Sequence, residues 1–186
     1  GPKVSSELLL DGVLAVAVAI IAMLIYIWLR FEWQFGLGAV MALSHDVFLT
    51  LGVFSLLGLE FNLSTVAAVL TIAGYSINDT VVVFDRIRED LRRFKSKPVV
   101  DLLNESINAT LSRTLMTSLT TLVALLALFF LGGEVIRDFS FAMIFGIVVG
   151  TYSSICVASP LLLYTNVAAR ARSAADESTE GTAEAS

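Results

Sequence analysis

Five long apolar stretches constrain this chain more than any other feature of its sequence. A membrane-spanning helix needs about 20 mostly apolar residues. Hydrophobic residues make up 56% of the 186, more than in an ordinary soluble domain. We place the spans at about 8–29, 35–57, 63–84, 111–131 and 139–164. The sequence therefore predicts an all-α fold, a polytopic transmembrane helix bundle of five spans, within a membrane domain covering residues 1–165.

The polar segments lie between the spans and after them. Residues 85–110 form the one sizeable polar segment. Its first part, RIREDLRRF, predicts a helical extension of the third span, and apolar residues recur every three or four positions after Pro98. This pattern predicts an amphipathic helix on the inner membrane surface. Residues 166–186 are rich in Ala, Ser, Thr and Glu and have no aromatic residue, so we expect a disordered tail. The chain has no signal-peptide pattern and begins close to its first span, as a fragment of a larger protein would.

Lysine and arginine residues predict the orientation of the spans, because they gather on the cytoplasmic side. If the 85–110 loop is cytoplasmic, ten of the twelve basic residues lie inside, and Lys3 and Arg137 lie outside. The N-terminus is then outside the membrane and the C-terminus is in the cytoplasm.

Asp79 is the most unusual residue within the spans. An ionisable group inside a membrane is costly and is found mainly where it is functional or paired. Asp79 lies six residues before Asp85, where the inner polar segment begins, about 9 Å deep at the helical rise. Tyr75, Ser76 and Asn78 could line a wet cavity beside it. In the functional interpretation, Asp79 binds and releases a proton. In the structural alternative, it forms a static buried pair with Arg113 that fixes helix register.

Arg113 opens the next span, about 3 Å inside it by the same rise. It either belongs to a charge site with Asp79 or extends to the interface, as arginines near helix ends often do. The two residues differ in depth by several ångströms. A contact between them therefore needs a bridging water or a deeper helix start.

His45 and Asp46 form a second polar pair inside a span. Adjacent helical residues point about 100° apart, so we expect one to face a cavity and the other to bind a neighbouring helix. Histidine titrates near neutral pH, which suits a proton relay. A hydrogen-bonded packing cluster is the alternative for both residues.

The last span carries two packing signals. Gly146 and Gly150 are four residues apart, a spacing that lets helices approach closely. Pro160 should kink or end the helix.

Several classes of function lack their motifs. The sequence contains no phosphate-binding GxxxxGK[ST] loop, no nucleophile elbow and no HExxH motif. Its single cysteine, Cys156, excludes an intrachain disulfide and any cysteine metal spacing. We therefore expect no enzyme activity, cofactor, metal site or nucleic-acid partner, and energy coupling through an ion gradient or a partner.

Several long motifs carry a family resemblance. GYSINDTVVVFDRIRE, ALSHDV, SRTLMTSLTTL, FFLGG and FSFAMIFGIVVGTYSSICVASPLL resemble SecF of the SecD–SecF family, in the resistance–nodulation–division (RND) superfamily. The resemblance covers residues 1–164. It implies spans two to six of a six-span subunit. These form half of a pseudo-symmetric RND-type membrane domain that SecD completes.

The resemblance also implies a function. Such a subunit uses the proton-motive force to assist export of a preprotein through the SecYEG channel, in the lipid of a bacterial or archaeal cytoplasmic membrane. The family's essential aspartate and arginine match Asp79 and Arg113, whereas the match of Asp46 to an HD motif implies no firm role. An RND-type exporter of small molecules or lipids and a non-titrating structural scaffold for the translocase are the alternatives.

Overall fold

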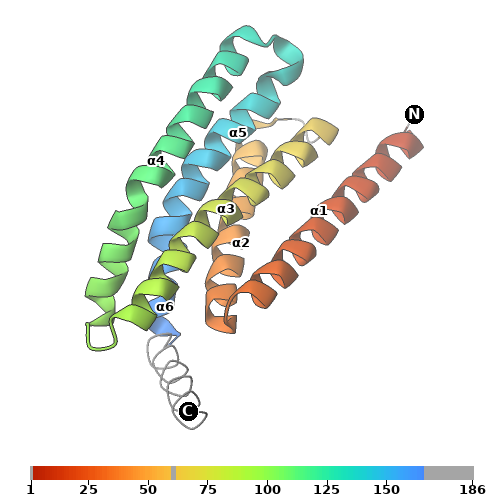
Figure 1. Ribbon diagram of the computed structural model, residues 1–186. Helices are drawn as coiled ribbons and strands as arrows, with labels where there is room; N and C mark the ends of the chain where they lie inside the picture. The colour runs from red at the N-terminus through yellow and green to blue at the C-terminus, as the bar shows by residue number, and fades with distance from the viewer. Residues whose placement is uncertain (1, 60–61, 166–186) are drawn as a thin grey trace.

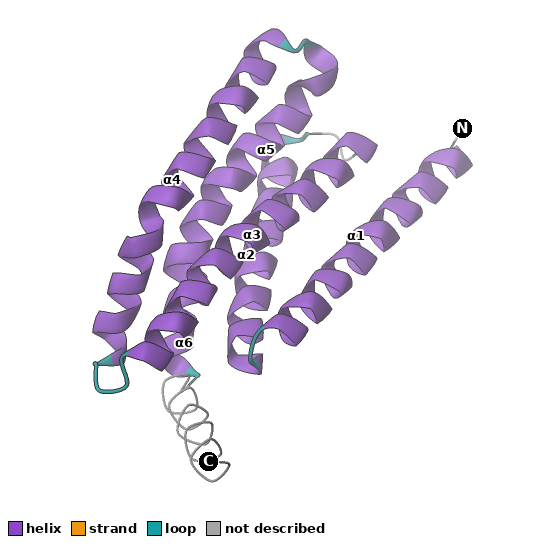
Figure 2. Ribbon diagram, in the orientation of Figure 1, coloured by secondary structure: helices purple, strands orange, loops and turns teal. Residues whose placement is uncertain are grey.

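The computed structural model describes residues 2–59 and 62–165, which fold into helices joined by short turns, with no strand among them (Figure 2). Five helical segments are long and apolar enough to cross a membrane. This confirms the predicted all-α bundle of five spans. The elements are α1 (Pro2–Arg30), α2 (Trp33–Leu57), α3 (Leu63–Arg93), α4 (Val99–Leu131), α5 (Glu134–Ser153), the π-helical turn η1 (Ser154–Ala158) and α6 (Ser159–Tyr164). The last three form one continuous span. The predicted tail, 166–186, lies outside the described residues.

Helix α3 is the centre of the bundle. It contacts α1, α2, α4 and α5, whereas α1 and α4 lie at opposite edges (Figure 1). In the apolar stretch of α3 that could cross a membrane, 56% of the residues are buried within the chain, against 11% in the corresponding stretch of α1. Side chains on α3 are therefore the ones best placed to meet residues from several other helices.

The two glycines of α5 allow its close approach to α3. A Cβ atom added at Gly146 would overlap Cδ1, Cγ1 and Cγ2 of Ile72, and one added at Gly150 would lie 3.2 Å from Ser76 Cβ. The predicted close packing at this glycine spacing is thus confirmed, with α3 as the partner.

The segment 85–110 has the predicted helical extension of the third span but not the predicted separate surface helix. Helix α3 continues to Arg93, and α4 begins at Val99 and runs unbroken into its span. The amphipathic part is the start of α4, where Leu102 and Leu103 are buried in the hydrophobic core. The reason is that no glycine or proline interrupts Val99–Leu131, so the helix has no point at which to turn onto a membrane surface.

Pro160 is accommodated by a change of helix type. Proline lacks an N–H group and its ring crowds the carbonyl four residues earlier. The structure widens the preceding turn into the π-helical turn η1, and Ser159 Oγ donates to the carbonyl oxygen of Ser154 at 2.9 Å. The helix continues past Pro160 and ends at Tyr164. Isolated π-helical turns are frequent at functional sites.

Candidate functional site

The Asp79 carboxylate is held by hydroxyl groups from two other segments. Thr114 Oγ1 on α4 donates to Asp79 Oδ1 at 2.6 Å, and Ser154 Oγ, the first residue of η1, donates to Asp79 Oδ2. The side chain is half-buried. One carboxylate on the central helix therefore joins α3 to both α4 and the last span.

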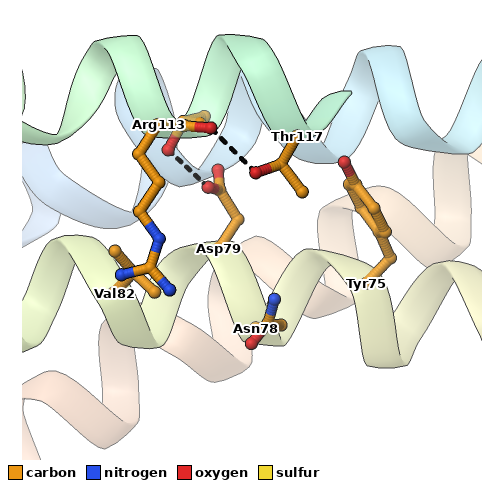
Figure 3. Close-up of a pocket in the computed structure, with 7 residues that line it drawn as sticks. Tyr75, Asn78, Asp79, Val82, Arg113 and Thr117 are labelled. Atoms are coloured by element: carbon orange, nitrogen blue, oxygen red, sulfur yellow. Dashed lines mark hydrogen bonds between the residues drawn. The ribbon is translucent and has the colours of Figure 1, made fainter. Parts of the chain in front are cut away.

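A small polar pocket lies beside Asp79. It measures about 80 Å³, room for a few water molecules. Its lining comes from α3 and α4 (Figure 3): Tyr75, Asn78, Asp79, Val82, Arg113, Thr114 and Thr117. The predicted supporting residues Tyr75 and Asn78 are thus placed beside the carboxylate.

Arg113 shares this pocket with Asp79 without pairing to it. The arginine is exposed, and its side chain extends from α4 towards Val82 on α3 (Figure 3). Among the described side chains the guanidinium and the Asp79 carboxylate form no ion pair, so the static buried pair is not what this structure contains. The next residue, Thr114, contacts Asp79 instead.

Asp46 forms a second, separate carboxylate cluster. Its side chain is fully buried, at 0% exposure, so its partners must come from the protein. Ser76 Oγ on α3 and Ser153 Oγ on α5 donate to Asp46 Oδ2 at 2.5 and 2.7 Å. His45 Nδ1 lies 3.0 Å from Asp46 Oδ1. The predicted supporting residues Asp46, His45 and Ser76 therefore meet around Asp46, not in the pocket beside Asp79.

The His45–Asp46 contact differs from the expectation that the two side chains would serve different neighbours. Asp46 does bind neighbouring helices, but the ring of His45 turns back to the carboxylate while 33% of that side chain stays exposed. The pair therefore connects a buried carboxylate to the surface of α2.

Sequence reasoning missed the hydroxyl groups that complete both clusters. Thr114, Ser153 and Ser154 each donate to a carboxylate. Tyr75 OH also donates to Ser118 Oγ at 3.3 Å, and Ser118 Oγ lies 2.6 Å from Thr151 Oγ1. A signal existed: Thr110, Thr114 and Ser118 recur every four residues on α4, a polar stripe inside an apolar span.

The chain has close relatives of known type. The family model "Protein export membrane protein SecD/SecF, C-terminal" matches residues 1–168. Protein translocase subunit SecF of Cereibacter sphaeroides is 59% identical over 167 residues, covering 90% of this chain and 52% of that protein. SecF of Rickettsia rickettsii is 55% identical over 162 residues, covering 87% and 53%. The chain thus spans about half the length of the curated relatives it matches.

Solved structures show the same arrangement of helices. SecDF from Thermus thermophilus, described as a translocon-associated membrane protein, superposes with a TM-score of 0.85 at 54% identity, over 88% of this chain and 23% of that one. SecDF in its super-membrane-facing form gives a TM-score of 0.79 at 52% identity, over 88% and 22%. With five apolar spans and this family match, the chain is a multi-pass membrane protein that belongs to the SecD/SecF family of protein export membrane proteins.

Proposed function

We propose that this chain is the proton-responsive part of a SecF subunit and assists protein export with energy from a proton gradient. The observation that carries the proposal is the Asp79 carboxylate, placed inside a span, bonded to hydroxyls of two other segments and open to a polar pocket with Arg113. Charged groups at such depth mark ion or proton pathways. The relatives are protein translocase subunits, so the process proposed for this chain is protein translocation.

Protonation of Asp79 would change helix contacts directly. An ionised carboxylate accepts hydrogen bonds only, whereas a protonated one also donates, and a hydroxyl can do either. When Asp79 gains a proton, its new O–H can donate to Thr114 or Ser154, and that hydroxyl then reorients so that it accepts the bond. Proton binding at α3 thereby alters its contacts with α4 and the last span. No covalent bond is made or broken, so the chain is no enzyme under this proposal.

The partners follow from the surface that the bundle leaves exposed. Only 11% of the apolar window of α1 and 17% of that of α4 are buried within the chain. Lipid or another membrane subunit must cover the rest. Because the solved structures that this chain resembles are those of SecDF, SecD is the proposed partner that completes a pseudo-symmetric RND-type domain. The SecYEG channel and an exported preprotein are the further partners under this proposal.

The orientation is testable by cysteine labelling. Ser96 is exposed in the α3–α4 turn and Glu134 is exposed at the start of α5, at opposite ends of the bundle. The distribution of basic residues predicts that Ser96→Cys is labelled only from the cytoplasmic side and Glu134→Cys only from the outside. Because Cys156 is exposed, both variants need a Cys156→Ala background. An impermeant maleimide that labels Ser96→Cys on intact spheroplasts contradicts the orientation.

Arg113 provides the test of the charge site. We expect Arg113→Leu to lower gradient-dependent export at least severalfold, because the pocket loses the cation that balances an ionised Asp79. Arg113→Lys should restore export in part, since lysine keeps the charge but not the planar guanidinium. The measurement is preprotein translocation into inverted vesicles with and without an imposed proton gradient.

The control for Arg113 is Arg137→Leu. Arg137 lies over the Phe129 ring near the other end of the bundle, outside the Asp79 pocket. Complex abundance is measured for each variant. Equal export by Arg113→Leu and Arg137→Leu complexes at normal abundance would remove Arg113 from the proposal.

A further inference from the structure

Two carboxylates on different helices are bonded to two consecutive residues. Ser153 Oγ donates to Asp46 on α2 at 2.7 Å, and Ser154 Oγ donates to Asp79 on α3. Consecutive helical residues point about 100° apart, so a pair of neighbouring serines can serve two separate helices at once. The last span therefore connects the Asp46 cluster to the Asp79 pocket through one peptide unit.

The two carboxylates differ in how firmly they are held. Asp46 is fully buried and has three side-chain partners: Ser76, Ser153 and His45. Asp79 is half-buried and borders the 80 Å³ pocket. A buried carboxylate with satisfied hydrogen bonds is costly to move, because any lost bond leaves an unpaired polar group. Asp46 is thus the fixed end of this connection and Asp79 the end open to change.

The backbone changes helix type between Ser153 and Ser154, and side-chain hydrogen bonds hold it on both sides of this change. Ser153 is the last residue of α5 and Ser154 the first of the π-helical turn, whose backbone hydrogen bonds depart from the α-helical pattern. Ser159 Oγ, five residues further along the chain, donates to the Ser154 carbonyl oxygen at 2.9 Å. The hydrogen bond from Ser153 Oγ to Asp46 holds the residue immediately before Ser154.

We propose that Asp46 is a positioning residue that, through Ser153, holds the Ser154 hydroxyl against Asp79. The inference rests on the proposed function, in which Asp79 carries the proton. It assigns Asp46 no proton of its own to transfer. Removing the Asp46–Ser153 bond removes the side-chain anchor next to Ser154, so the Ser154 hydroxyl is held less firmly against Asp79, which has only one other hydroxyl donor, Thr114.

Other charged or titratable groups face this network and must stay constant in a test. They are His45 on α2, Tyr75 on α3 and Arg113 on α4, whereas α5 and η1 contribute the hydroxyls of Thr151, Ser153 and Ser154. A serine substitution changes none of these charges. Ser153→Ala is therefore the most direct variant, and Ser153→Thr, which keeps the hydroxyl, is the second.

The experiment measures the protonation of Asp79 itself. A hydrophobic carbodiimide labels protonated carboxyls, and peptide mass spectrometry of the full SecD–SecF complex separates the Asp79 adduct from an Asp46 adduct. We expect Ser153→Ala to shift the pH midpoint of Asp79 labelling, because the carboxylate loses the hydroxyl donor that Ser153 helps to position. Ser153→Thr, which keeps a hydroxyl, should return it towards the wild-type midpoint.

Ser140→Ala is the matched control. Ser140 is a buried serine on the same helix whose Oγ has no hydrogen-bond partner among the described residues, so its removal should leave the midpoint unchanged. Equal midpoints for Ser153→Ala and Ser140→Ala, in complexes of normal abundance, overturn the positioning role alone. If Asp79 of the wild type shows no pH-dependent labelling, the proposed proton carrier fails as well. The two failures are therefore distinguishable.

Discussion

Replacing Asp79 with asparagine is expected to abolish the gradient-dependent part of protein export while the complex still assembles. Asparagine has nearly the same shape, and its Oδ1 can still accept from Thr114. Its amide can donate to the Ser154 oxygen, because a hydroxyl also accepts. The contacts that join α3 to α4 and the last span are thereby kept, but the side chain no longer titrates.

The measurement is preprotein translocation with and without an imposed proton gradient, with complex abundance determined in parallel. Asp85→Asn is the matched control, since Asp85 lies on the same helix but is exposed and pairs with Arg30 at 2.9 Å. We expect that control to retain gradient-dependent export. Normal gradient-dependent export by an assembled Asp79→Asn complex would rule out the proton carrier and favour the structural scaffold.

The second large effect is expected at Gly146. Every side chain begins with a Cβ atom, and here that atom would overlap three carbons of Ile72, a buried and β-branched residue with little rotamer freedom. Gly146→Leu must push α5 away from α3, at a cost of roughly 1–3 kcal/mol or more. Gly150→Ala should cost less, because its Cβ would lie 3.2 Å from Ser76 Cβ, tight but within reach of a small shift.

Thermal unfolding of the purified complex in detergent, together with its abundance in membranes, measures this effect. Val148→Leu is the control, since Val148 is on the same helix but 53% exposed, and its enlargement should change stability by no more than about 0.5 kcal/mol. If Gly146→Leu and Val148→Leu unfold at the same temperature, the close approach of α5 to α3 is unimportant for stability.

The membrane fold was predictable because its signal is long and redundant. Each span is about 20 apolar residues, and an error of a few positions at either end leaves the number of spans unchanged. The start of α4 was harder. Leu102 and Leu103 have the spacing of a surface helix and of a core-facing helix alike, and only their burial in the structure separates the two.

The candidate site was predictable in its charges and in Tyr75 and Asn78, the neighbours of Asp79 on its own helix. Asp79 and Arg113 stand out because charged residues are rare inside apolar spans. Ser153 and Ser154 carry no such signal, since serines in membrane helices also serve as small packing residues. The separation of Asp46 from the Asp79 pocket depends on which faces of α2, α3 and α5 meet. Tertiary packing sets those faces, and no local pattern reveals them.

The continuous last span has a consequence for how its sequence can vary among homologues. Its register is fixed at three places: Gly146 against Ile72, Ser153 at Asp46 and Ser154 at Asp79. Inserting or deleting one residue between the first and the last would rotate one end relative to the other by about 100° and shift it by about 1.5 Å. The Gly146–Ile72 contact and the Ser154–Asp79 hydrogen bond could then not form together. Substitutions at its exposed positions are therefore compatible with the fold, whereas changes in length between Gly146 and Ser154 are not.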